Sequence, residues 1–165
     1  MSTKEMSRKV ISILVDNKPN TLARISSLVG RRNFNIETIT ASETNLPGVT
    51  LITIVVTDTD SDALEQIVAQ IEKLEVVREV HVMSNTGGLY RELLLLKVMV
   101  DKKGRSSLRE IVDIYRAKII DLSKSSMIIE LTGEPTKIDG FMELMGDYEL
   151  VEVCRTGVTG MNRGI

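Results

Sequence analysis

The sequence contains few of the residues on which catalytic and metal sites are built. Its 165 residues include one histidine, one cysteine and no tryptophan, and aromatic residues make up 3%. One histidine and one cysteine cannot supply a zinc site without several carboxylates, and the sequence has neither a nucleophile-elbow nor a P-loop motif. A single cysteine excludes an internal disulfide framework and suits a reducing, cytoplasmic location. These absences favour a chain that binds over one that catalyses.

The two remaining reactive side chains have structural explanations. His81 stands between two valines in a strand-like stretch, so alternation predicts that it points away from their face and is exposed or interfacial. Cys154 ends another strand-like run, where we expect a small buried residue. We assign neither side chain to a site, and we expect no metal ligands and no catalytic residues in this chain.

The chain also lacks a basic face and a long apolar run. Its formal net charge is −2, with lysine and arginine spread along the sequence. Nucleic-acid binders usually combine a basic face with aromatic residues that stack on bases. The longest apolar runs, such as residues 93–96, are far shorter than the ~20 residues of a membrane-spanning helix, and residues 1–9 show no signal-peptide core. We therefore expect no nucleic-acid partner and no membrane association.

What is present is one order of strands and helices that occurs twice. In the first half, the expected strands cover residues 10–15, 35–42, 49–57 and 76–83, and apolar stripes at helical spacing are centred on Ile25 and Ile67. This β-α-β-β-α-β order predicts a ferredoxin-like module, in which an antiparallel four-stranded sheet carries both helices on one face.

The second half repeats the order. Its expected strands cover residues 92–100, 118–123, 127–131 and 149–154, and its helical stripes are centred on Val112 and Phe141. Ser107 and Glu110 have capping-box spacing, and Pro135 suits the first turn of the last helix. The fold class is therefore α+β with two tandem modules: a first domain at 8–84, a linker at 85–90 and a second domain at 91–165. We interpret residues 157–160 as part of a flexible tail.

The polar loop before the first helix is the best candidate for a ligand site. A helix N-terminus presents N–H groups and a positive dipole end that attract a carboxylate, and an asparagine amide can accept from an ammonium group. We expect the topology to bring Asn35, at the start of the second strand, beside the end of the first strand. The set would suit an apolar amino acid. The candidate residues are Asn17, Lys18, Pro19, Asn20, Thr21, Leu22, Asn35 and Ile36.

A plainer interpretation explains the same residues equally well. Asn17 and Asn20 are typical turn and helix-cap residues, so they could shape the loop without binding anything. The residues alone favour neither interpretation.

The stretches from Asp16 to Arg24 (DNKPNTLAR) and from Arg32 to Ile39 (RNFNIETI) resemble an ACT domain. More narrowly, they resemble the regulatory small subunit of acetolactate synthase, also called acetohydroxyacid synthase. The resemblance continues through residues 91–93, residues 119–121 and the tail at 155–164, so that it spans residues 8–164.

The resemblance implies a specific function. Such subunits dimerise through their ACT sheets and bind valine, sometimes leucine or isoleucine, at the dimer interface. They associate with a catalytic large subunit that uses thiamine diphosphate, magnesium and FAD to make acetolactate from pyruvate. The small subunit itself holds no cofactor, raises the activity of its partner and confers feedback inhibition. The ligand loop would be residues 17–22, and Asn35 with Ile36 would face it.

One position departs from the family pattern. The family loop usually has glycine where this chain has Asn20. Glycine there permits a positive φ and a close approach of the ligand carboxylate, and asparagine is the best substitute for the positive φ. We expect Asn20→Gly to keep or tighten ligand binding.

Two other classes of function remain open at this point. The runner-up is a stand-alone two-module amino-acid sensor that regulates a different enzyme or a transcriptional system. A small enzyme of this topology, such as a phosphatase, is a distant third. Co-purification with a catalytic subunit would distinguish the first two, whereas the third predicts turnover by this chain alone.

Overall fold

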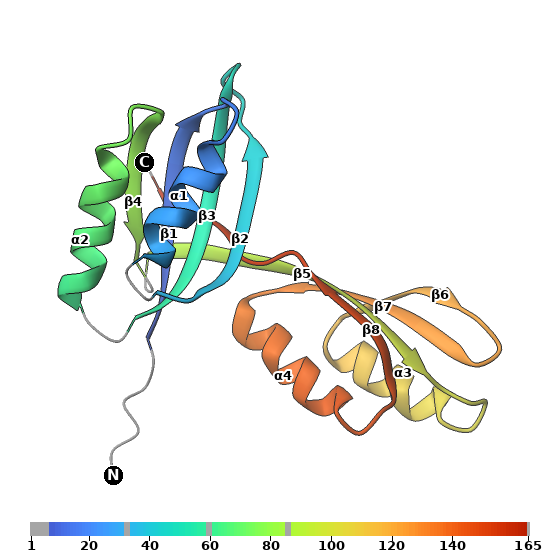
Figure 1. Cartoon of the computed structure of the whole chain (residues 1–165). Helices are drawn as coiled ribbons and strands as arrows, with labels where there is room; N and C mark the ends of the chain where they lie inside the picture. The colour runs from blue at the N-terminus through green and yellow to red at the C-terminus, as the bar shows by residue number, and fades with distance from the viewer. Residues whose placement is uncertain (1–6, 32–33, 59–60, 85–86, 165) are drawn as a thin grey trace, which may run out of the picture. The chain divides into compact units, whose positions relative to one another are not determined.

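The computed structural model describes residues 7–31, 34–58, 61–84 and 87–164. They form two compact units, one made by Met1–Leu89 with Gly160–Ile165 and the other by Tyr90–Thr159. Each unit combines a sheet with two helices, which confirms the predicted α+β class (Figure 1). The predicted domain limits of 8–84, 85–90 and 91–165 stay a prediction. Positions 85 and 86 of that linker lie outside the described residues, and residues 88–90 begin a strand.

The first unit has the predicted β-α-β-β-α-β order. Its elements are β1 (Ser7–Asp16), α1 (Thr21–Gly30), β2 (Ile36–Glu43), β3 (Val49–Asp58), α2 (Ser61–Glu72) and β4 (Val77–Met83). The sheet order is β2-β3-β1-β4, and every neighbouring pair is antiparallel. Consequently β1 and β2, which both pair with β3, run in the same direction.

The core of the first unit lies between this sheet and its two helices. Ile11, Ile13 and Val15 alternate along β1, are fully or almost fully buried, and pack in one cluster with Ile25 and Val29 of α1. Burying an aliphatic side chain of this size contributes roughly 1.5–3 kcal/mol. The packing therefore fixes where β1 ends and α1 begins, which positions the loop between them.

The second unit repeats the arrangement. Its elements are β5 (Gly88–Met99), α3 (Arg105–Ile114), β6 (Lys118–Leu122), β7 (Ser126–Gly133), α4 (Pro135–Met145) and β8 (Leu150–Arg155). The strand order β6-β7-β5-β8 matches that of the first unit position by position. Leu94, Leu96 and Val98 alternate into a core where Phe141 meets Tyr115 edge to face, with ring centroids 5.2 Å apart. Pro135 lies in the first turn of α4, as predicted.

The interpretation of the tail as flexible is wrong. A short strand, β9 (Thr159–Asn162), pairs with β5 and makes the second sheet five-stranded instead of four-stranded. Arg155 holds the preceding segment, because its guanidinium pairs with the buried Glu92 carboxylate and lies 2.9 Å from Asp139. A four-residue run of Thr, Gly, Met and Asn carries no alternating pattern, so this strand depends on its partner.

Cys154 is exposed, which corrects the expectation that it is buried. It lies opposite Leu95, which places it on the sheet face turned away from the core, and every residue of β8 is exposed. His81 is exposed, as predicted, and its Nε2 lies 2.7 Å from Oε1 of Glu79. None of the helices in the described segments is long and apolar enough to cross a membrane.

The capping box at Ser107 and Glu110 is wrong as well. Helix α3 begins at Arg105, so Ser107 lies inside its first turn, and the cap position, Gly104, has no side chain to offer. Instead, Oδ1 of Asp101 accepts the backbone N–H groups of Lys103 at 3.0 Å and Gly104 at 2.8 Å. The aspartate closes the turn that leads into α3, and the helix itself has no side-chain cap.

This arrangement predicts different effects for two alanine substitutions. Asp101→Ala should lower the free energy of unfolding of the second unit by about 1 kcal/mol, because two N–H groups lose their acceptor. Ser107→Ala should change it by less than about 0.5 kcal/mol, since alanine suits a helix interior. All three tyrosines of the chain lie in the second unit, so urea unfolding followed by tyrosine fluorescence reports on it. Equal effects of the two substitutions would contradict the assignment.

Candidate functional site

The loop between β1 and α1 turns on a left-handed residue. Asn20 has φ 66° and ψ 3°, and its side chain makes no capping hydrogen bond to α1. The positive φ expected at this position is confirmed, and the interpretation of Asn20 as a side-chain cap is wrong. The turn is closed by the buried Thr21, whose Oγ1 donates to the carbonyl oxygen of Lys18 at 2.9 Å.

The first turn of α1 leaves two backbone donors available. The N–H of Thr21 lies 3.4 Å from the Lys18 carbonyl oxygen, and the N–H of Arg24 donates to the Asn20 carbonyl at 3.0 Å. Among the described residues, the N–H groups of Leu22 and Ala23 have no acceptor within the chain. The Leu22 side chain is 44% exposed beside them. Two adjacent donors at a positive helix end form a place for a carboxylate.

Asp16, the last residue of β1, anchors the loop to the sheet. Its carboxylate accepts from Nε of Arg78 in β4 at 2.7 Å and lies 3.1 Å from Nζ of Lys18. The hydrogen bond from Arg78, and secondarily that from Lys18, lowers the pKa of the Asp16 carboxyl below its ordinary value. Lys18 is therefore held by Asp16, which makes it a loop-shaping residue in this chain.

The sequence did not point to Glu43, which lies beside Asn17. The Asn17 side chain donates from Nδ2 to Oε1 of Glu43 at 3.2 Å, and the Asn17 backbone N–H donates to the Gly48 carbonyl at 2.9 Å. The other atom of the Asn17 side-chain amide, Oδ1, can therefore accept a hydrogen bond from another group. Glu43 is the last residue of β2. The topology alone could have revealed it, because β1 and β2 run in the same direction and their C-terminal residues lie at the same end of the sheet.

Within one chain, Asn35 does not lie beside the end of β1, so that expectation is wrong. Asn35 immediately precedes β2, whose Ile36 is opposite Val56, whereas Glu43 at the other end is opposite Thr50. Seven strand residues separate the two ends by roughly 23 Å. The structure therefore brings residues 17–22 together and leaves Asn35, with the partly buried Ile36, at the opposite end of the sheet.

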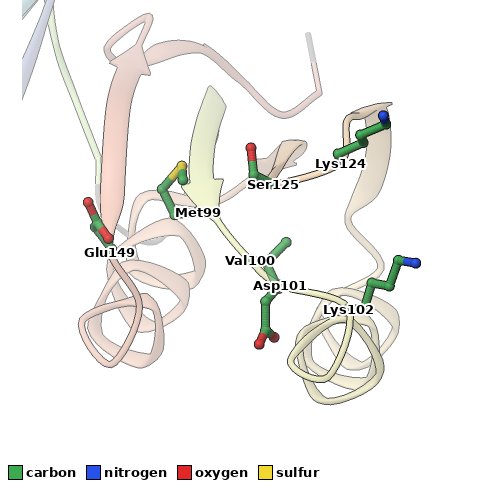
Figure 2. Close-up of a pocket in the computed structure, with 7 residues that line it drawn as sticks. All are labelled: Met99, Val100, Asp101, Lys102, Lys124, Ser125 and Glu149. Atoms are coloured by element: carbon green, nitrogen blue, oxygen red, sulfur yellow. The ribbon is translucent and has the colours of Figure 1, made fainter.

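A separate cavity of about 520 Å³ lies in the second unit (Figure 2). The end of β5, the β6–β7 turn and the start of β8 form it, with Lys102 and Lys124 on one side and Glu149 on the other. No predicted site residue lines it, and its charges are mixed, so we assign it no ligand. In the segments that the structure describes, no three His, Cys, Asp or Glu side chains cluster so that they could hold a metal ion.

Comparison with known proteins identifies the family. The ACT domain model of acetohydroxyacid synthase small subunits matches residues 11–79, and a model described as the small subunit of acetolactate synthase matches residues 91–164. The chain belongs to the acetolactate synthase small subunit family. This confirms the resemblance seen in the sequence and supports a regulatory role over a catalytic one.

Individual small subunits match over nearly their whole length. The probable small subunit of Methanothermobacter thermautotrophicus is 39% identical over 156 residues, which cover 94% of this chain and 92% of that protein. The small subunit of Bacillus subtilis is 35% identical, with 95% and 91% covered. The crystal structure of the Thermotoga maritima small subunit matches with a TM-score of 0.87 at 35% identity, covering 96% of this chain and 99% of that one.

The Asp16 anchor of this small subunit predicts a measurable pH dependence. A lowered pKa means that Asp16 contributes stability above the ordinary aspartate pKa, and that this contribution is lost as the pH falls through the lowered value. NMR titration of the Asp16 carboxyl carbon should show the low pKa. Arg78→Ala should raise it more than Lys18→Ala, because the Arg78 hydrogen bond is the larger cause. An ordinary pKa in the unsubstituted protein would refute the anchor.

Proposed function

We propose that this chain is the feedback-sensing regulatory subunit of an acetolactate synthase in branched-chain amino-acid biosynthesis. It binds valine or another branched-chain amino acid, raises the activity of the catalytic large subunit and makes that activity inhibitable. Thiamine diphosphate, magnesium and FAD belong to the catalytic partner, and this chain holds no cofactor. The observation that carries the proposal is the loop of residues 17–22 in a chain of this family. Its left-handed Asn20 leads into a helix whose Leu22 and Ala23 N–H groups have no acceptor among the described residues.

The loop provides a partner for each end of an amino acid. The ligand carboxylate accepts from the N–H groups of Leu22 and Ala23 at the positive end of α1. The ligand ammonium donates to the side-chain oxygen Oδ1 of Asn17, next to the negative Glu43 carboxylate. The exposed Leu22 side chain supplies apolar contact for a branched side chain.

A second copy of the chain completes the site. Strand β2 is an edge of the first sheet, and edge strands are templates for pairing with another chain. Antiparallel pairing of β2 with its copy about a two-fold axis lays the start of one strand beside the end of the other. Asn35 and Ile36 of the second copy then approach Asn17 and Glu43, which resolves the distance that separates these residues within one chain.

A ligand bound where the two β2 strands pair touches both chains, so its affinity depends on how the two chains are placed relative to each other. We call this ligand-binding interface the β2 seam. It regulates if the two copies are placed differently in the active and inhibited complexes, and the coupling equals the difference in its affinity for the two states. Such couplings are typically ~1–3 kcal/mol, which the burial of one branched aliphatic side chain can supply. The cytoplasmic location and the domain limits given above complete the proposal.

Reconstitution with the catalytic large subunit tests the proposal. Acetolactate formation from pyruvate should rise when this chain is added and fall again with valine. Asn17→Ala should keep the activation but lose the response to valine, whereas Asn20→Gly, which retains the left-handed backbone, should keep the response. An activity that this chain leaves unchanged would favour the stand-alone sensor, and turnover by this chain alone would favour an enzyme.

Mixing two inactive variants tests whether the site spans two chains. Asn17→Ala and Asn35→Ala should each abolish valine binding in calorimetry. Refolded together, they should form mixed dimers with one intact site, because Asn17 of one chain meets Asn35 of the other. Valine binding should then recover to about one quarter of the wild-type stoichiometry, since half of the dimers are mixed under random assortment. No recovery, with mixed dimers demonstrated, would place both asparagines outside a shared site.

A further inference from the structure

The second unit has an apolar edge strand that the proposed function does not use. Strand β6 occupies the same place in its sheet as β2 does in the first, and all five of its residues are exposed. Ile119 is 38%, Ile120 50% and Leu122 54% exposed. Apolar side chains along a sheet edge favour pairing with another strand, and charges on the same edge decide which strand fits.

A β-bulge places the two charged residues of β6 on one face. Lys118 is opposite Glu130 of β7 and Asp121 is opposite Ile128, so the strand shifts register at Ile120. Glu130 and Ile128 alternate with the buried Met127 and Ile129, so they face away from the helices. Lys118 and Asp121 therefore point to the same outer face, although residues three apart in a regular strand point to opposite faces.

We propose that β6 pairs antiparallel with β6 of a second copy of this chain. In the register where Lys118 lies opposite Asp121 of the copy, Ile119 lies opposite Ile120, and the two-fold axis repeats both contacts. The segment Lys-Ile-Ile-Asp is thus complementary to itself in charge and in apolar character. Opposite charges at directly facing positions favour such a register, and the like-charge registers are disfavoured.

Both charges are available for this pairing. The Lys118 ammonium is largely exposed and lies 3.7 Å from Glu130, which is a weak surface contact. Asp121 is exposed and makes no ion pair within the described part of the chain. The second copy therefore supplies the partner that Asp121 lacks.

The other edge of the same sheet does not offer this match. Strand β8 has Glu152 and Arg155 at the same spacing, but it runs without a bulge between them. Glu152 is opposite Lys97 and Arg155 is opposite Leu94, so the two charges lie on opposite faces. Arg155 is also engaged by Glu92 and Asp139. The distinction depends on the bulge at Ile120 and identifies β6 as the self-complementary edge.

Cysteine cross-linking of the full-length chain tests the register directly. In a Cys154→Ser background, which removes the exposed native thiol, Lys118→Cys with Asp121→Cys should form a chain-to-chain disulfide under mild oxidation. Each single cysteine variant should cross-link far less, because copies of the same position are not opposite each other. A covalent dimer supports the pairing, because the two-fold axis uses both cysteines of each chain within one pair, whereas a longer ladder of linked chains would contradict it. A double variant that links no more than the single variants would overturn it.

A charge exchange gives a second, independent measurement. In sedimentation equilibrium, Lys118→Asp should weaken self-association by about fivefold or more, because each facing pair becomes repulsive. Adding Asp121→Lys should restore it, although the exchanged Asp still lies next to Glu130. Loss without restoration, or no loss in the single variant, would refute the charge complementarity. Valine binding in the first unit should be unaffected, so failure here is distinguishable from failure of the proposed function.

Discussion

The backbone conformation of Asn20 is the constraint on which the proposed ligand site depends. A right-handed residue at this position would continue the turn differently and would direct the first N–H groups of α1 elsewhere. The left-handed turn ends β1 and starts α1 within a few residues, while Thr21 closes it from inside and Asp16 ties it to β4 through Arg78. A left-handed backbone conformation costs non-glycine residues conformational free energy, and it costs asparagine less than most others. The loop therefore makes its left-handed turn with an asparagine at the position where the resemblance leads us to expect glycine.

Local chemistry in the sequence was sufficient for the elements and insufficient for their partners. The alternation in β1 and the stripes of the four helices predicted both modules, because each segment buries its own apolar side. The positive φ of Asn20 was expected from the family resemblance, which implies glycine at this position, and asparagine tolerates it better than most residues. By contrast, β9 has no pattern of its own and exists by pairing with β5. The turn before α3 is closed by Asp101, which lies outside the spacing that suggested a cap at Ser107.

The misplacement of Asn35 has a different origin. Sequence order suggested that a residue at the start of the second strand lies beside the end of the first. However, β1 and β2 run in the same direction on either side of β3, so their C-terminal residues lie at the same end of the sheet. The same reasoning, applied correctly, would have led from Asn17 to Glu43. The error is informative, because a site that needs both Asn17 and Asn35 cannot be built from one chain of this topology and requires a two-fold relation.

The two modules share a strand order but present different edges to a partner. At β2 the pairing proposed here carries a ligand, so the seam depends on the concentration of an amino acid. At β6 the proposed contacts are a charge pair and two isoleucines, and they involve no ligand. A chain with one ligand-dependent and one ligand-independent seam can change the placement of its first modules without dissociating, because the second seam holds the copies together. Regulation by rearrangement, as opposed to regulation by assembly, is the behaviour that such a division of roles permits.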